Sequence, residues 1–243
     1  MKIIKYKYLN NSKYKIYLEQ DEIELYEDII INYNILNKKE LSKEEIDNLL
    51  KENNYYDLYY KSIKYIKAKL RTKKEIHKYL EKYNASLKDI KSIIEKLEKD
   101  GYINDELYAK SYIHDSIILK LDGPLKIKKH LLDEGISNDI VIEELKEFDD
   151  ELIDEKIEKY ITKSLKQNKN KSLYALKQKL IYNLINLGYE KDNILNHIEN
   201  INYSDEELKE KEYDKLYKKL SNKYSGKELE FKIKQKLYEK GFR

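Results

Sequence analysis

The residue types that most often catalyse reactions or bind metals occur in this sequence, but their spacing suits neither task. The four histidines are scattered along the chain: His77, His114, His130 and His197. There is no cysteine to complete a zinc site. Adjacent carboxylates such as Asp149 and Asp150 fit a helix N-cap as well as they fit a metal. Phosphate-binding glycine loops are also missing. We therefore expect no enzyme activity, no cofactor and no metal.

Lysine is the residue type that offers a binding chemistry. Two blocks of basic residues contain no acidic residue, one between positions 59 and 74 and one between 163 and 179. The candidate binding residues in them are Lys61, Lys64, Lys67, Arg71, Lys73, Lys74, Lys163 and Lys166. The first four are three or four positions apart, which predicts one stripe on a helix. Such blocks attract phosphate or an acidic protein surface, and a solvated helix face is the competing interpretation.

Tyrosine offers a second possible contact with nucleic acids. The chain has 25 Tyr but only three Phe and no Trp. Tyr beside Lys can stack on unpaired bases. A chain with Tyr as almost its only aromatic residue is better explained if Tyr fills the core and its hydroxyl reaches the rim. We expect this core role for most of them.

The composition favours helices and narrows the class of protein. Charged residues make up 39% of the chain, and there are only one Pro and six Gly. The absence of Cys excludes disulfides and thiolate metal sites. No apolar run approaches the roughly 20 residues that cross a bilayer, and the N-terminus does not resemble a secretion signal. A soluble, cytoplasmic, monomeric protein without membrane contact is expected.

Residues 1–56 differ from the rest of the chain. Apolar and polar residues alternate in KIIKYKYL, YKIYLE and EIELYE, with turn-like residues between them. This pattern predicts a small antiparallel sheet over about residues 2–27. Ser42 precedes Glu45 by three residues, which predicts a capping box and a short helix. Residues 1–56 are thus assigned to a β-rich extension with a short helix.

The remainder of the chain is helical and internally repeated. A Leu is followed four residues later by Gly or Asn at Leu80/Asn84, Leu131/Gly135, Leu184/Gly188 and Leu237/Gly241. This period of about 50 residues predicts tandem three-helix repeats at 57–103, 104–148 and 149–202, and a partial repeat at 203–243. The expected core residues are Ile76, Leu80, Ile90, Ile94, Leu97, Ile127, Leu131, Leu145, Leu180 and Leu184.

The stretch KLEKDGYIND marks the passage from the first repeat to the second. Gly101 is expected to take the left-handed conformation that ends a helix, with Tyr102 and Ile103 folding back onto that helix. Asn104 or Asp105 can then cap the next helix.

Three segments of the chain resemble the RecX family, whose members modulate the RecA recombinase. AKLRTKKEIHKYL is similar to the first-repeat pattern of that family, LEKDGYINDELYAKSYI to its corner motif, and DGPLKIKKHLLDEGIS to the motif that follows. The motif residues carried over are Gly101, Tyr102, Asp105, Tyr108, Ala109, Gly123, Pro124 and Gly135. The resemblance covers about residues 57–145.

The resemblance implies a mainly α fold: an elongated, curved array of three-helix repeats with a small N-terminal antiparallel β segment. It also implies a non-enzymatic regulator in DNA repair and the SOS response. Its partner would be the RecA filament, within whose groove it would restrain strand exchange, ATP turnover and co-protease function, with weak contact to single- or double-stranded DNA.

The second repeat departs from the family pattern at one place. Members often carry Arg where this chain has His114, Asp115 and Ser116. Arginine's planar fork is not replaced by these residues. Phosphate contacts are therefore expected from the first basic block or from Lys126, Lys128 and Lys129. The alternative function is a helical-repeat nucleic-acid binder that acts without RecA.

Overall fold

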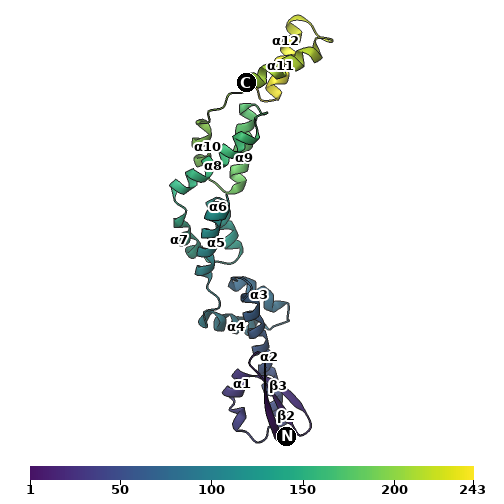
Figure 1. Ribbon diagram of the computed structural model, residues 1–243, viewed down its shortest axis with the longest axis vertical. Helices are drawn as coiled ribbons and strands as arrows, with labels where there is room; N and C mark the ends of the chain where they lie inside the picture. The colour runs from purple at the N-terminus through teal and green to yellow at the C-terminus, as the bar shows by residue number, and fades with distance from the viewer. The chain divides into compact units, whose positions relative to one another are not determined.

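The computed structural model describes residues 1–243, which form two compact units, 1–108 and 109–243. The first contains β1 (Ile3–Leu9), β2 (Lys13–Leu18), β3 (Glu22–Tyr26), α1 (Glu27–Asn32), the 3-10 helix η1 (Ile35–Asn37), α2 (Lys43–Ile66), α3 (Lys73–Glu81) and α4 (Leu87–Lys99) (Figure 1). Helix α5 (Asp105–Leu119) leads from the first unit into the second. The second contains α6 (Pro124–Asp133), α7 (Asn138–Glu144), η2 (Leu145–Glu147), α8 (Asp150–Gln167), α9 (Leu173–Leu187), α10 (Lys191–Glu199), α11 (Glu206–Leu220) and α12 (Gly226–Glu239). A mainly helical chain with a small N-terminal antiparallel sheet is confirmed.

The three strands form an antiparallel sheet in the order β1-β2-β3. Successive side chains of a strand point to opposite faces of the sheet. One face is buried, and on it Ile16 of β2 lies opposite Ile23 of β3. Beyond β3, the side-chain amide of Asn53 on α2 accepts a hydrogen bond from the N–H of Tyr26 at 2.9 Å and donates one to the carbonyl of Glu24 at 3.1 Å. An amide side chain thus takes the place of a neighbouring strand at that edge.

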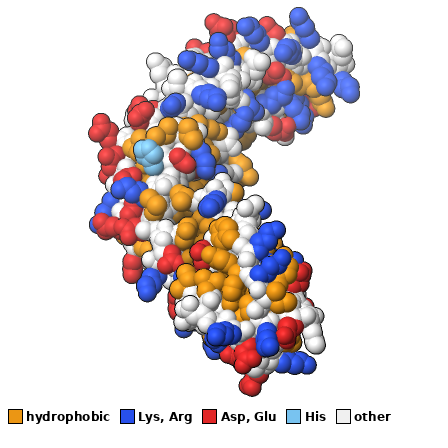
Figure 2. All heavy atoms as spheres, turned by 60° about the horizontal axis from the view of Figure 1, so that its bottom comes forward, with side chains coloured by type: hydrophobic (Ala, Val, Ile, Leu, Met, Phe, Trp, Pro, Cys, Tyr) orange, Lys and Arg blue, Asp and Glu red, His pale blue; other side chains and the backbone are white.

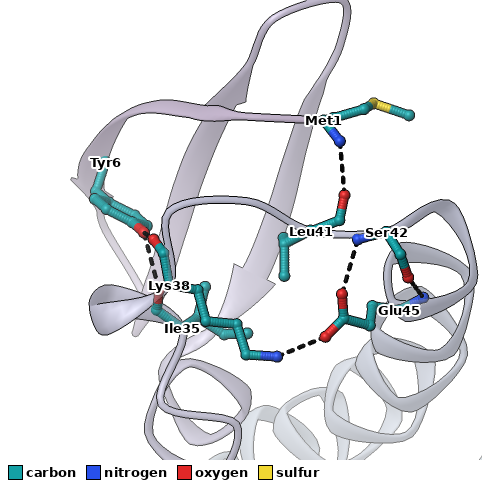
Figure 3. Close-up of polar contacts among 7 residues, drawn as sticks. All are labelled: Met1, Tyr6, Ile35, Lys38, Leu41, Ser42 and Glu45. Carbon is teal, nitrogen blue, oxygen red and sulfur yellow. Dashed lines mark hydrogen bonds and ion pairs between the residues drawn. The ribbon is translucent and has the colours of Figure 1, made fainter.

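The segment that follows α1 is fastened to the start of the chain (Figure 3). The amino group of Met1 donates to the carbonyl of Leu41 at 2.8 Å, and the N–H of Leu41 donates to the carbonyl of Met1 at 3.0 Å. The Tyr6 hydroxyl lies within hydrogen-bond distance of the carbonyls of Ile35, at 2.9 Å, and Lys38, at 3.1 Å. These contacts hold residues 35–41 beside the beginning of β1.

Helix α2 begins at the predicted capping box but does not end where the sequence suggested. The Ser42 hydroxyl accepts from the N–H of Glu45 at 3.1 Å, and the Glu45 carboxylate accepts from the N–H of Ser42 at 2.7 Å. The expected short helix and the separate repeat helix from residue 57 are instead one helix of 24 residues. It continues because Tyr56, Tyr59 and Ile63 extend its buried face.

The repeat pattern corresponds to a shared backbone feature. The residue four positions after each anchor Leu has a positive φ: 54° at Asn84, 83° at Gly135, 89° at Gly188 and 85° at Gly241. These residues follow α3, α6, α9 and α12, so each of these helices ends in the same way. All four anchor leucines are buried. The division of the chain at residues 57, 104, 149 and 203 remains a proposal.

Most of the predicted core residues are buried. They are Ile76, Leu80, Ile90, Leu97, Ile127, Leu131, Leu180 and Leu184. Ile94 and Leu145 are only half-buried. In the first unit the helical core is continuous with that of the sheet, because Ile16 and Leu25 belong to the same apolar cluster as Ile76 and Leu97.

The corner at Gly101 has the conformation that the sequence predicted. Gly101 has a φ of 77°, and the N–H of Tyr102 donates to the carbonyl of Leu97 at 2.8 Å. Ile103 folds back and is buried, whereas Tyr102 remains 40% exposed. Asn104 is the cap, since its side-chain oxygen accepts from the N–H of Leu107 at 2.9 Å.

In the second unit, the start of one helix lies against the end of a later one. The N–H of Gly123, before α6, donates to the carbonyl of Leu187 at 2.6 Å, and the N–H of Leu125 donates to the carbonyl of Gly188 at 3.0 Å. At the next junction, the Ser172 hydroxyl, before α9, donates to the carbonyl of Lys240 at 2.8 Å. Polar groups at the start of one helix therefore hydrogen-bond to carbonyls at the end of another, which have no partner within their own helix.

None of the twelve helices has both the length and the apolar character that a membrane-spanning helix requires.

Candidate binding surface beside the end of α2

The last turns of α2 border a hollow of about 510 Å³ in the first unit. Lys61, Lys64 and Lys67 line one side of it, as the predicted stripe requires. The remaining lining comes from Asn11, Ser12, Tyr26, Tyr60, Ile63 and Tyr102. The structure therefore brings together a helix, a hairpin turn and the Gly101 corner around three lysines. We name this set of residues the α2 hollow.

The wall of the α2 hollow is built from the hairpin and from stacked tyrosines. Asn11 and Ser12, in the turn between β1 and β2, have positive φ values of 62° and 57°. Tyr60 stacks on Tyr26, with ring centroids 4.7 Å apart and planes 15° from parallel. The Tyr60 hydroxyl donates to Asp28 at 2.6 Å, which fixes this ring in place.

The three lysines of the stripe differ in how free they are. The Lys61 ammonium pairs with Asp57 at 2.7 Å and lies 4.8 Å from the centre of the Tyr83 ring. Burial alone would raise the pKa of Asp57, but hydrogen bonds from Lys61 and Tyr26 lower it below its usual value. Lys64 and Lys67 are exposed and have no acidic partner. These two carry the charge available to a ligand.

Arg71 does not belong to the stripe, and this corrects the sequence-based prediction. Helix α2 ends at Ile66, so Arg71 lies in the loop before α3. Its guanidinium pairs with Glu75 at 2.8 Å and lies 3.8 Å from the centre of the Tyr65 ring, and its side chain is only 13% exposed. Glu75 also accepts from the N–H of Thr72 in a capping box. The position of Arg71 is that of a packing residue.

Lys73 and Lys74 begin α3. The Lys73 ammonium pairs with Glu98 at 2.6 Å, and that hydrogen bond raises the pKa of Lys73. Its backbone N–H donates to Asp105 at 3.2 Å. Burial raises the pKa of Asp105, and the hydrogen bond from Lys73 opposes that shift. Asp105 of the family motif thus holds the start of α3, while Lys74 is exposed in its first turn.

The remaining candidate lysines lie in the second unit. Lys126 pairs with Asp122 at 2.6 Å. With Lys129 and His130 it lines a second hollow of about 520 Å³, whose apolar residues are Leu125 and Ile185. Lys128 is half-buried on the same helix. Lys163 and Lys166 are exposed on α8.

The other family-motif residues have packing roles. Ala109 is fully buried and Tyr108 half-buried on α5. Pro124 is the first residue of α6, where its missing N–H is tolerated. Gly123 is buried at the junction with Gly188, and Gly135 has the positive φ that ends α6. These residues shape the scaffold rather than a binding surface.

Sequence reasoning missed most of the wall of the α2 hollow. The residues NNS were identified only as a turn, and Tyr60 was not distinguished from the other tyrosines. No local sequence pattern predicts that the turn near residue 12 lies close to the helix near residue 64. The core role expected for most of the tyrosines holds for only a few of them. Tyr59 and Tyr189 are buried, and their hydroxyls donate to Asp100 at 2.5 Å and to the carbonyl of Leu121 at 3.0 Å, whereas most of the 25 Tyr are half-buried or exposed.

Charge on the surface is mixed in sign. On the face shown in Figure 2, Lys and Arg side chains are interspersed with Asp and Glu, and apolar patches lie between them. No group of three or more His, Asp or Glu side chains is placed to hold a metal ion. The α2 hollow offers lysine and tyrosine side chains for binding, and no Asp, Glu or His lines it.

Known proteins resemble this chain over nearly its whole length. It is 35% identical over 236 residues to regulatory protein RecX of Streptococcus agalactiae serotype III, covering 93% of this chain and 90% of that protein. It is 31% identical over 243 residues to regulatory protein RecX of Streptococcus gordonii, covering 95% and 92%. No protein-family model matches the chain.

Solved structures show the same fold. A crystal structure of regulatory protein RecX aligns with a TM-score of 0.73 at 24% identity, covering 82% of this chain and 99% of that one. The crystal structure of RecX from Lactobacillus salivarius aligns with a TM-score of 0.57 at 27% identity, covering 65% and 97%. On the strength of its identity to these curated relatives across almost its full length, the chain belongs to the RecX family of regulatory proteins.

Proposed function

We propose that this protein binds the RecA–DNA filament in the cytoplasm and restrains strand exchange, ATP turnover and co-protease function. The observation that carries the proposal is the α2 hollow in a member of the RecX family. There Lys64 and Lys67 present free ammonium groups beside Tyr60 and Tyr102.

The chemistry of the α2 hollow suits a nucleoprotein surface. Free lysines attract phosphate or carboxylate groups over distances of about 10 Å at moderate salt. Exposed tyrosine edges add apolar contact that does not weaken with salt in the same way. Both kinds of contact are available within one concave surface. In this proposal the protein acts by occupying the filament, without a chemical step of its own.

The test is a titration of RecA ATP hydrolysis on single-stranded DNA. The variant is Lys64→Glu with Lys67→Glu, which leaves the Lys61–Asp57 pair and Arg71 intact. The matched control is Lys78→Glu with Lys88→Glu, two exposed lysines outside the α2 hollow with the same change in charge. We expect the variant to need about tenfold more protein for half-inhibition, a loss of about 1.4 kcal/mol in binding. The control should match the wild type.

Two outcomes would contradict the proposal. Equal inhibition by the variant and the wild type would remove the α2 hollow from the interface. A wild type that fails to inhibit at any ratio would remove RecA as the target. Binding to single-stranded DNA without RecA, measured over a range of salt, distinguishes the alternative. A nucleic-acid binder that needs no RecA would bind single-stranded DNA with full affinity at low salt. That affinity would fall steeply as the salt concentration rises.

A further inference from the structure

Strand β1 has a free edge. Residues 39–41 cover only its beginning, where the N–H of Ile3 donates to the carbonyl of Lys39 at 2.9 Å and Lys2 pairs with Glu40. From Lys5 to Leu9, β1 is hydrogen-bonded to β2 on one side and has no strand on the other. A row of backbone donors and acceptors is therefore open to an additional strand.

A hollow of about 600 Å³ lies beside the first part of β1, where this free edge begins. Its lining includes Ile4, Lys5 and Tyr6 from β1, and Lys38 and Lys39 from the segment before α2. The Tyr6 side chain bridges from β1 to this segment, because its hydroxyl lies within hydrogen-bond distance of the carbonyls of Ile35 and Lys38 (Figure 3). Ile4 is 63% exposed and Tyr8 57% exposed, so apolar surface accompanies the open backbone.

The opposite edge of the sheet, formed by β3, is not open to an additional strand. There the Asn53 amide satisfies the N–H of Tyr26 and the carbonyl of Glu24. A second copy of the chain therefore has no open acidic β3 edge to offer. Pairing of β1 with β1 of a second copy would bring Lys5 and Lys7 near one another, because the strand contains no acidic residue. A partner strand must come from elsewhere.

The pairing of β2 with β3 indicates what such a strand would contain. On one face Lys15 lies opposite Glu24 and pairs with Glu22, and on the other Ile16 lies opposite Ile23. Strand β1 has the same alternation on its free edge, with Lys5 and Lys7 on one face and Tyr6 and Tyr8 on the other. The complement to this edge is a strand that alternates acidic and apolar residues, as β3 does.

We propose that the free edge of β1 binds an extended acidic–apolar peptide segment of another protein as a fourth strand of the sheet. Backbone hydrogen bonds would hold it, and its acidic side chains would pair with Lys5 and Lys7. Lys7 has no acidic partner, and the Lys5 ammonium lies 4.4 Å from the centre of the Tyr17 ring. This site is separate from the α2 hollow, and the proposal does not depend on the RecA assignment.

The test uses a fluorescent peptide that repeats EIELYE, the sequence of residues 22–27. Anisotropy measures its affinity for the full chain, and amide spectra locate the residues that respond. One control peptide has Lys in place of every Glu, and another carries N-methyl groups on consecutive residues, so that neither of its edges can pair with a strand. We expect both controls to bind at least about tenfold more weakly. The amide shifts should concentrate in Lys5 to Leu9.

Variants of the full chain complete the test. Lys5→Glu with Lys7→Glu should weaken binding of the acidic peptide about tenfold. Lys7→Glu alone keeps the Lys5–Tyr17 contact and provides a second, milder variant, which should weaken it about threefold. Lys78→Glu with Lys88→Glu is again the matched control and should bind normally. Equal binding of the N-methylated peptide would overturn the proposal, because attraction of charge alone would then explain it. Shifts confined to Lys64 and Lys67, or preferential binding of an oligonucleotide to the β1 edge, would also overturn it.

Discussion

The backbone of Gly188 leaves no room for a side chain on Gly123. A Cβ atom on Gly123 would lie 2.6 Å from the carbonyl oxygen of Gly188. Gly123 has a φ of −87°, which any residue can adopt, so the requirement for glycine there is purely steric. Gly101 has the opposite requirement: its φ is 77°, yet nothing lies within 4 Å of the position of a Cβ atom.

These two glycines allow close packing and backbone conformation to be tested separately. Gly101→Ala should lower the free energy of unfolding by about 1–2 kcal/mol, the cost of a left-handed conformation. Gly123→Ala should cost more, because the backbone of α6 must move away from that of α9, and such overpacking alone costs about 1–3 kcal/mol in addition to the hydrogen bonds it breaks. Thermal unfolding followed by circular dichroism gives both values. If Gly123→Ala lost less stability than Gly101→Ala, the close packing of the Gly123 and Gly188 backbones would be contradicted.

Two buried serines should respond differently to the same substitution. The Ser116 hydroxyl is fully buried and has no hydrogen-bond partner. The Ser62 hydroxyl, also fully buried, donates to the carbonyl of Leu58 at 2.9 Å. Ser116→Ala should stabilise the protein by about 1 kcal/mol, because an unsatisfied polar group is removed. Ser62→Ala should be neutral or destabilising, and chemical denaturation measures both. A loss of stability in Ser116→Ala would show that its hydroxyl is satisfied in solution.

Arg71 and Lys64 provide a test of the correction to the basic stripe. Arg71→Ala removes the pair with Glu75 and the contact with the Tyr65 ring, and we expect a loss of about 1–2 kcal/mol in the free energy of unfolding. Lys64→Ala removes an exposed side chain without a partner and should change stability by less than about 0.5 kcal/mol. Denaturant titration of the two variants checks this. If Lys64→Ala were the more destabilising variant, the assignment of the two residues would be reversed.

The start of α2 should make the protein sensitive to acid. Hydrogen bonds from Lys38 and from the N–H of Ser42 lower the pKa of Glu45 from 4.5 to about 2. A carboxylate with a depressed folded-state pKa stabilises the protein above its unfolded-state pKa, and that contribution disappears as the pH falls through the folded-state value. The expected window is therefore about pH 4.5 down to about pH 2.

Glu45→Gln isolates this contribution. The variant should be less stable than the wild type at pH 7, and the difference should shrink as the pH falls through the same window. Melting temperatures of both proteins at intervals between pH 7 and about pH 2 provide the measurement. If the melting temperatures of the two proteins changed in parallel with pH, the ionisation of the Glu45 carboxylate would make no contribution to stability.

The features that the sequence predicted well depend on neighbouring residues. The capping box at Ser42 and the left-handed conformation at Gly101 are local, and the repeated anchors report burial on one face of each helix. The α2 hollow is lined by residues more than 40 positions apart, such as Ser12 and Lys64, and no periodic pattern in the sequence predicts that they lie around one hollow. Arg71 was misplaced because the spacing of basic residues continues beyond the end of α2 at Ile66.

Two junctions in the second unit join the start of one helix to the end of another: α6 to α9 through backbone atoms, and α9 to α12 through the Ser172 hydroxyl and the carbonyl of Lys240. At the first, the donors are the N–H groups of Gly123 and Leu125 and the acceptors are the carbonyls of Leu187 and Gly188. Every residue except proline carries both groups, so such a joint constrains side-chain identity only where a Cβ atom would collide. Descendants of a common ancestor can therefore exchange many surface side chains around these joints without separating the helices. That freedom is consistent with a relative that shares 35% of its residues over nearly the whole chain.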